Sequence, residues 1–144
     1  MIVESYLNKT PAGITALNTV AAYNSALATA TKERTIEPAR RRAASSCIQC
    51  TSDVSRIASY IAKGRVVTLT NGQPTRWASV ALFISSLSPT GVVTVDFDGI
   101  ETGVVLKSRS GSVIVRDGST SVISEEDDVD VHDGGKIVAK FGRS

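Results

Sequence analysis

The feature that most constrains this chain is a change of residue pattern beyond its midpoint. Up to about Leu87, the apolar residues fall mostly at helical spacing among Ala, Ser and Thr, whereas from Gly91 to Phe141 they form short β-branched runs separated by Gly and Asp. Helices followed by strands are typical of an α+β protein and not of an alternating α/β enzyme fold. We therefore expect a helical hairpin over residues 1–64 and a small antiparallel β-sheet or barrel over residues 65–144, together in one compact domain.

The composition is that of a folded protein with an aliphatic core. Of the 144 residues, 42% are hydrophobic but only 5% are aromatic, so Val, Ile, Leu and Ala must build the interior. The formal net charge of +2 is too small to indicate a nucleic-acid or membrane binder by itself. No apolar run approaches the roughly 18 residues of a membrane-spanning helix, and the first ten residues hold no secretory segment. We therefore expect a protein made in a cytoplasm, with no membrane partner.

Two helices are predicted in the first part. Thr10 is a suitable N-cap and Pro11 a suitable first helical residue, and this helix is expected to end between Ala30 and Glu33. A second helix is predicted from Glu37-Pro38 to Gly64, where a left-handed C-cap is expected. Its apolar stripe runs at spacings of three and four residues through Ala43, Cys47, Cys50, Val54, Ile57 and Ile61, and is expected to lie in the core or in a subunit contact.

Strands are predicted over residues 65–70, 91–97, 102–107, 112–116, 119–124, 129–131 and 136–141. Asp98-Gly99 and Asp117-Gly118 stand between β-branched runs and predict hairpin turns. Connections this short indicate an antiparallel meander. Residues 75–87 fit a helix and an alternating strand, and we favour a short helix that ends at Ser88-Pro89.

Cys47 and Cys50 form a CxxC sequence. A redox pair of this kind usually lies at a helix N-terminus, and here the predicted helix places both residues in its interior. A zinc site needs two further ligands, but there is no second CxxC, and His132 is the only histidine. We favour buried, inert thiols over a redox or metal function.

The densest charge in the chain is the acidic run Glu125, Glu126, Asp127 and Asp128. It continues to Asp130 and His132 in the manner of a calcium loop, but the later positions of that motif do not match. We favour a solvated loop and edge strand, charged to discourage wrong pairing, over a weak surface cation site. The run could also dock onto a basic partner.

The most basic segment contains Arg40, Arg41 and Arg42, with Lys32 and Arg34 upstream. Three consecutive helical residues spread over about 200° and cannot all face one groove. We favour a solvated face or a contact with an acidic partner over phosphate binding. Stacking aromatic residues are nearly absent from the segment, which argues against single-stranded nucleic acid.

The sequence contains few of the residue patterns that are typical of enzymes. A single histidine removes most Ser-His-Asp and Cys-His arrangements, and the phosphate-binding, dinucleotide-binding, zinc-protease and nucleophile-elbow motifs are all missing. The only paired carboxylates are in the acidic run. We therefore predict a protein that is not an enzyme and uses no cofactor.

The Ala/Ser/Thr-rich helices, the Gly-punctuated, Val-rich strands from Gly91 to Phe141 and the small size together resemble structural proteins of tailed bacteriophage particles. The capsid cement (decoration) proteins and the head-tail neck proteins are the subclasses concerned. The resemblance implies a symmetric oligomer, often a dimer or trimer in cement proteins, that binds across the joints between capsid subunits. It also implies that neighbouring subunits close the strand edges, and that the protein is located in the virion.

The function expected from these observations is that of a structural protein in a larger assembly. The partners expected are further copies of the chain and a shell such as a capsid. Arg40 to Arg42 and Glu125 to Asp128 are the expected contact surfaces, together with strand edges and loops after Gly91. The alternative is a nucleic-acid-associated module that uses the segment Lys32–Arg42 on phosphates. A ligand-binding or sugar-binding barrel is a third possibility, without an aromatic platform to support it.

Overall fold

The first helix begins and ends as its sequence predicts. In the computed structural model, which describes residues 9–69, 77–101, 103–117 and 121–142, helix α1 spans Pro11–Glu33. The Thr10 hydroxyl accepts a hydrogen bond from the Gly13 amide at 3.0 Å, which satisfies one free N–H of the first turn. Arg34 then adopts a left-handed conformation, with φ of 61°, and ends the helix.

The predicted second helix is wrong in its first half. The chain instead forms a single turn, α2 (Glu37–Arg40), and a separate helix, α3 (Ile48–Ala62). Between them, residues 42–44 lie against strand β7 (Lys136–Gly142), where Ile137 donates to the Arg42 carbonyl and accepts from the Ala44 amide, both at 2.8 Å. These bonds to a distant strand replace the helical bonds that the local spacing suggested.

The end of α3 agrees with the prediction. Gly64 has a positive φ of 70° and its amide bonds to the Ile61 carbonyl at 3.0 Å, while the Arg65 amide bonds to the Tyr60 carbonyl at 2.8 Å. This pair of bonds is the Schellman motif, and the left-handed position favours glycine.

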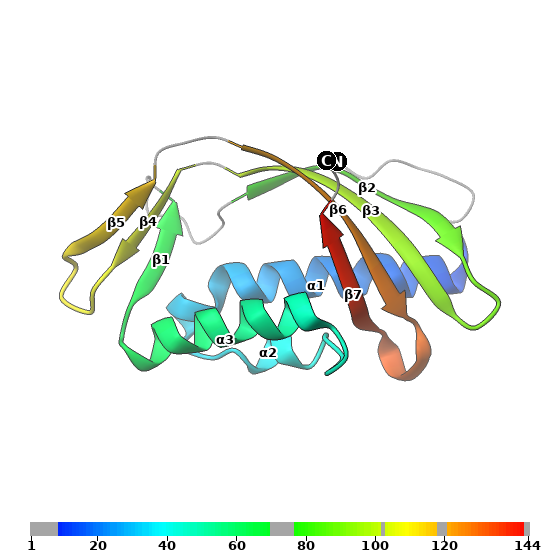
Figure 1. Ribbon diagram of the computed structural model, residues 1–144, viewed down its shortest axis with the longest axis horizontal. Helices are drawn as coiled ribbons and strands as arrows, with labels where there is room; N and C mark the ends of the chain where they lie inside the picture. The colour runs from blue at the N-terminus through cyan, green and yellow to red at the C-terminus, as the bar shows by residue number, and fades with distance from the viewer. Residues whose placement is uncertain (1–8, 70–76, 102, 118–120, 143–144) are drawn as a thin grey trace.

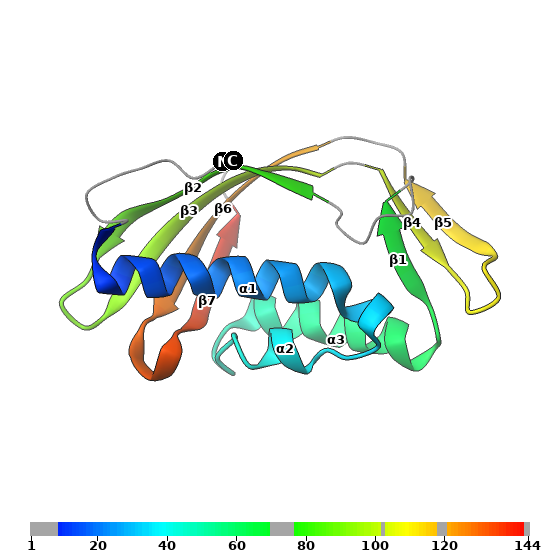
Figure 2. The same cartoon turned by 180° about the vertical axis from the view of Figure 1, so that it is seen from behind.

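After the helices, the described residues form seven strands in two antiparallel sheets. The four-stranded sheet has the order β2 (Trp77–Leu87), β3 (Val92–Glu101), β6 (Ser121–Asp130), β7. The three-stranded sheet has the order β1 (Val66–Leu69), β4 (Val104–Lys107), β5 (Val113–Asp117). Figures 1 and 2 show both sheets as one curved layer over the helices. Neither sheet closes into a barrel within the described part of the chain, so the α+β class is confirmed as open sheets.

One long hairpin contributes to both sheets. Strands β3 and β6 pair from Val92 opposite Asp130 to Glu101 opposite Ser121, and β4 and β5 continue in nearly the same register from Val104 opposite Asp117. Residues 108–111 form its tip, where the Gly111 amide bonds to the Ser108 carbonyl at 3.0 Å. The outer half of this hairpin, residues 104–117, is called the β4–β5 arm below.

Three local predictions in the strand region are wrong. Residues 77–87 form strand β2 and not a helix, because β3 offers them a partner along nearly their whole length. Asp98-Gly99 lies inside β3, opposite Ser124 and Ile123, and makes no turn. Residues 121–130 form one continuous strand, so the acidic run lies in neither a loop nor an edge strand. The second predicted turn, Asp117-Gly118, extends into residues outside those described.

The core lies between the four-stranded sheet and the helices. Helix α1 presents Ala16, Val20 and Tyr23, all with no exposed surface, and the short connection between β6 and β7 packs onto it at Gly135, where a side chain would collide with Thr19. None of the described helices is long and apolar enough to cross a membrane. The other buried apolar residues of this cluster include Cys50, Val54, Ile57, Val93, Val95, Val129 and Ile137, so the predicted stripe of the second helix does lie in the core where α3 carries it.

Candidate functional site

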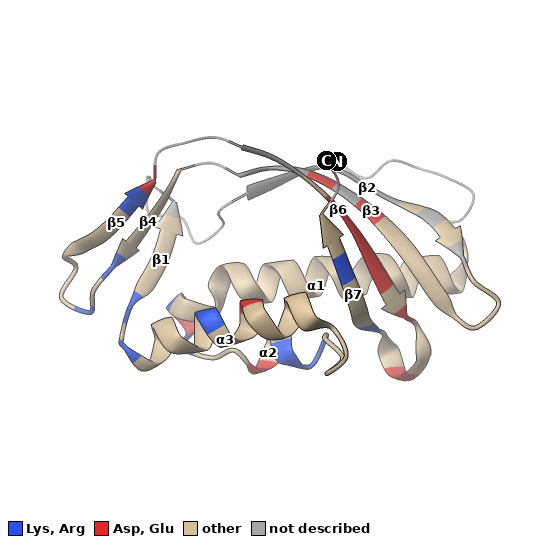
Figure 3. Cartoon of the chain, viewed as in Figure 1, with Lys and Arg blue, Asp and Glu red and all other residues tan. Residues whose placement is uncertain are grey.

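The predicted basic contact residues lie on the helical side of the molecule. Arg40 is the last residue of α2 and forms an exposed ion pair with Glu37. Arg41 and Arg42 follow in the turn after α2, and both side chains are exposed. Figure 3 shows these cations around α2, whereas the carboxylates of β6 lie in the sheet. The structure therefore does not bring the two predicted charged segments together in one patch.

The acidic run divides between the two faces of the four-stranded sheet. Successive side chains of a strand point to opposite faces, and β6 is flanked by β3 and β7. Glu125 and Asp127 therefore face the helices, where the Asp127 side chain is completely buried. Glu126 and Asp128 face outward and are only partly buried. Asp127 thus cannot belong to an exposed contact surface, contrary to the prediction from the sequence.

A buried charge cluster surrounds Lys140 on β7. Its side chain is 5% exposed, and the Nζ atom lies 3.2 Å from Glu125 Oε2 and 3.6 Å from Asp127 Oδ2. The same atom stands 4.8 Å from the centre of the Tyr23 ring, at cation–π distance. Lys140 is directly opposite Asp127 in the β6–β7 register. We call Lys140, Glu125, Asp127 and Tyr23 the buried charge cluster.

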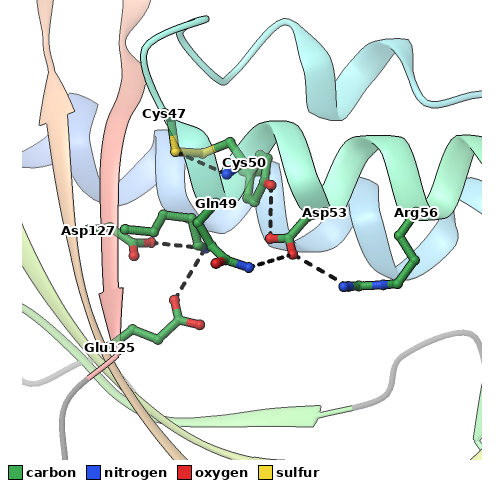
Figure 4. A network of polar contacts seen from close by, with 9 residues as sticks. Cys47, Gln49, Cys50, Asp53, Arg56, Glu125 and Asp127 are labelled. Carbon is green, nitrogen blue, oxygen red and sulfur yellow. Dashed lines mark hydrogen bonds and ion pairs between the residues drawn. A yellow bond between two sulfur atoms is a disulfide. The ribbon is translucent and has the colours of Figure 1, made fainter.

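Helix α3 extends this network towards the surface, as Figure 4 shows. The Tyr23 hydroxyl donates to Asp53 Oδ2 at 3.3 Å. The other oxygen, Asp53 Oδ1, accepts from the Gln49 side chain at 3.1 Å and from Arg56 at 3.4 Å. Positions 49, 53 and 56 are one helical turn apart, so α3 presents the three side chains on one face. The network therefore ties α1, α3 and both strands β6 and β7 together.

Burial raises the pKa of Asp127 to about 7. The nearby Lys140 ammonium opposes that shift, and the negative charge of Glu125 adds to it. Burial, followed by the charge of Asp53, also raises the pKa of the Tyr23 hydroxyl, so this group stays protonated and serves as a donor. Burial thus favours the protonated form of Asp127 and the neutral form of the Tyr23 hydroxyl.

A cavity of about 370 Å³ opens beside the cluster, between α1, α3 and the strands β1 and β7. Leu27, Ile57 and Val67 form apolar parts of its lining, and Lys140 and Glu125 lie at its polar end. The Oδ1 atom of Asn24, also in the lining, is buried without a hydrogen-bond partner. The size lies at the small end of the range for ligand pockets.

The sequence predicted that the CxxC residues lie in the middle of a helix. In the structure they lie at a helix N-terminus. Cys47 is the N-cap of α3, and its sulfur accepts a hydrogen bond from the Cys50 amide at 3.2 Å. The two residues form a disulfide, so they are not free thiols, although both are completely buried as expected. The bridge closes the first turn of α3, directly after the residues that pair with β7.

The outward face of β3 and β6 is acidic. Asp96 lies directly opposite Glu126 in the register, and Asp128 and Asp98 accept hydrogen bonds from Thr94 at 2.8 Å and Ser124 at 2.7 Å. The described residues contain no group of three or more His, Cys, Asp or Glu arranged to hold a metal ion.

His132 lies at the β6–β7 turn and makes a local contact. Its ring Nδ1 is 2.6 Å from Asp130 Oδ1, and its backbone amide donates to the same oxygen at 3.0 Å. These bonds lower the pKa of Asp130. The pair is exposed and has the character of a turn contact.

The most unusual surface belongs to the β4–β5 arm, which the sequence analysis did not single out. Every residue of β5 is exposed, and the side chains of Val113, Ile114 and Val115 are 48%, 41% and 54% exposed. The sequence signal was available as a run of three β-branched residues. Its exposure was not, because that depends on which strands the helices cover in the folded chain.

Comparison with known proteins adds no further constraint. No family model matches the chain, and neither a curated protein nor a solved structure matches it.

Proposed function

We propose that this chain is a non-enzymatic structural protein that forms protein–protein contacts within a larger assembly. The observation that carries this proposal is the β4–β5 arm, whose last strand exposes three consecutive β-branched residues. An edge strand offers a row of backbone donors and acceptors, and exposed aliphatic residues on such a strand favour pairing with another polypeptide. Soluble monomers usually protect such an edge with charge, proline or a covering segment.

The assembly proposed is a virion of a tailed bacteriophage, with this chain as a capsid cement (decoration) or head-tail neck protein. The resemblance in sequence style supports it, as does the combination of an open sheet edge with a compact helix-backed sheet. In this role, Arg40 to Arg42 and the outward carboxylates Glu126 and Asp128 supply electrostatic contacts, and the β4–β5 arm supplies the apolar one.

Light scattering after size exclusion tests the proposal on nuclease-treated protein over a range of concentrations at low and high salt. The expected result is association that increases with concentration and persists at high salt, because an apolar strand contact does not depend on screened charges. Val115→Lys, at an exposed position, should reduce this association without changing the thermal midpoint. A strict monomer at all concentrations that also fails to bind phage particles contradicts the proposal.

A nucleic-acid-binding module remains the second candidate, because Arg40, Arg41 and Arg42 are all exposed on one short segment. Phosphate binding weakens steeply with salt in proportion to the contacts made. Arg41→Glu should abolish such binding and leave association through the β4–β5 arm unchanged. Co-purified nucleic acid that is lost in this variant would favour the second candidate.

A further inference from the structure

Strand β5 ends the three-stranded sheet, and among the described residues β4 is the strand that pairs with it. Its five residues, Val113–Asp117, are all exposed. The three apolar residues at its start contain neither a proline nor a charge, although a β-bulge, which also discourages edge pairing, lies at Ile114. The chemistry of this edge therefore suits a second extended strand.

The sequence of β5 is symmetric about one residue. Ile114 has a valine on each side, Val113 before it and Val115 after it. A two-fold contact between identical subunits requires a patch that is complementary to itself. We propose that β5 pairs with β5 of a second copy of this chain, antiparallel and with Ile114 opposite Ile114 on the two-fold axis.

This register matches apolar residues and separates charges. Val113 of each copy lies opposite Val115 of the other on one face, and the two Ile114 side chains meet on the other face. Arg116 lies opposite the other copy's Ser112. The two Arg116 residues are four positions apart along the paired strands, about 13 Å at the usual rise per residue. Registers shifted towards the end of β5 would bring the two arginines together or set them against aliphatic side chains.

A bulge on β5 is compatible with this contact. The register between β4 and β5 shifts between the pairs Leu106–Val115 and Lys107–Val113, which leaves Ile114 as the extra residue. A bulge increases the local twist of a strand. In the proposed register the bulged residue Ile114 of each copy lies on the axis, so the pairing must accommodate the same added twist in both copies.

The contact is small, so we expect a weak dimer in solution and stable association only within an assembly. Pairing would turn two three-stranded sheets into one of six strands, which is a common size. A stable interface usually buries about 800 Å² on each partner, more than a strand of five residues provides. The contact is therefore expected to contribute through repetition of many linked copies. This inference rests on the proposed assembly function and names one of its contacts.

Cysteine crosslinking on the full chain tests the register. Directly opposed residues of an antiparallel pair have Cα atoms about 4.5–5.5 Å apart, which suits a disulfide. Ile114→Cys should therefore form a covalent dimer under mild oxidation, at least about tenfold faster than Arg116→Cys. The native cysteines do not interfere, because both are buried and already bonded to each other.

A mixed pair provides the matched control. Ser112→Cys and Arg116→Cys should crosslink quickly when the two variants are mixed, and slowly when each is alone. Crosslinking of Arg116→Cys alone, or equal rates at all positions, overturns the proposed register. If no variant crosslinks but the chain still associates or binds particles, the two-fold pairing is wrong and the assembly function stands. If no association of any kind is observed, both proposals fail.

Discussion

Strands β5 and β6 are consecutive along the chain, and they place their side chains in opposite environments. β6 carries the acidic run and buries Asp127 completely, whereas β5 carries Val113 to Val115 and exposes all three. The reason is what covers each strand: β6 lies between two strands over the helices, whereas β5 projects beyond the described helices. Edge position alone does not expose a strand, because β7 is also an edge strand and buries Ile137 completely. Burial in this protein therefore depends on whether the helices cover a strand, and not on the hydropathy of its residues.

The compensation differs between the two strands. In β6, Lys140 balances the buried carboxylates from the neighbouring strand β7, and Tyr23 covers the ammonium from α1. A buried charge is tolerated only when it is paired in this way. In β5, no buried pairing is needed, and the cost of exposed aliphatic surface is removed when another molecule covers it. The first arrangement is internal, and under the proposed function the second is completed by a partner.

Removal of Lys140 should have the largest effect. Lys140→Met keeps the length of the side chain but leaves Glu125 and Asp127 without their cation, so we expect a loss of about 3–5 kcal/mol in the free energy of unfolding at pH 7. Urea denaturation measures it. The loss should shrink at pH 5, where Asp127 is protonated. An unchanged midpoint at pH 7 would show that the ion pairs do not support the four-stranded sheet.

The next largest effect should be a pH dependence of stability that is due to Asp127. Its pKa in the folded state, about 7, is above its unfolded value, so the folded protein binds more protons between about pH 4 and pH 7. Stability should therefore fall as pH rises through this range and level off above it, by an amount on the order of 2–4 kcal/mol.

Asp127→Asn isolates this contribution, because the other groups that titrate remain. Asp130, whose pKa is lowered, acts in the opposite sense at the acid end, losing stability as the pH falls. The difference between wild type and variant should slope downwards from pH 4 to pH 7. A flat difference would contradict a buried, proton-exchanging carboxyl at position 127.

Valine-to-alanine substitutions in the two sheets should lower the free energy of unfolding by unequal amounts. Val93→Ala removes two methyl groups from a side chain with no exposed surface, and we expect a loss of about 2 kcal/mol. Val115→Ala, at a 54% exposed position, should change stability by less than about 0.5 kcal/mol. Thermal or chemical denaturation of dilute monomer measures both. Equal losses of stability would mean that other residues of the same chain pack against β5 in solution.

A smaller effect than that of Val93→Ala is expected on the outward face of the four-stranded sheet. Thr94→Val keeps the shape of the side chain and removes its 2.8 Å hydrogen bond to Asp128, so a loss of about 1 kcal/mol is expected. Asp128 is only partly buried, and water can replace the donor. A loss as large as that of Lys140→Met would show that this face is covered as tightly as the inner one.

Local chemistry in the sequence determined the ends of elements in this protein. Thr10 and Pro11 start α1, Gly64 ends α3, and the β-branched runs after Gly91 form strands, because caps, left-handed positions and side-chain branching act within a few residues. The separation of helices from strands, and with it the α+β class, could be predicted for the same reason. The candidate contact residues Arg40 to Arg42 were likewise predicted as exposed from charge alone.

The tertiary structure decided whatever depends on a distant partner. Ile137 draws residues 42–44 out of the predicted helix, which moves the cysteines to a helix N-terminus. β3 makes a strand of residues 77–87, and Lys140 allows Asp127 into the core. Strand β5 projects beyond the described helices, which leaves its valines exposed. The spacing of residues within a segment shows which side chains share a face. Whether burying that face is favourable depends on the strand or helix that packs against it, and this partner is present only in the folded chain.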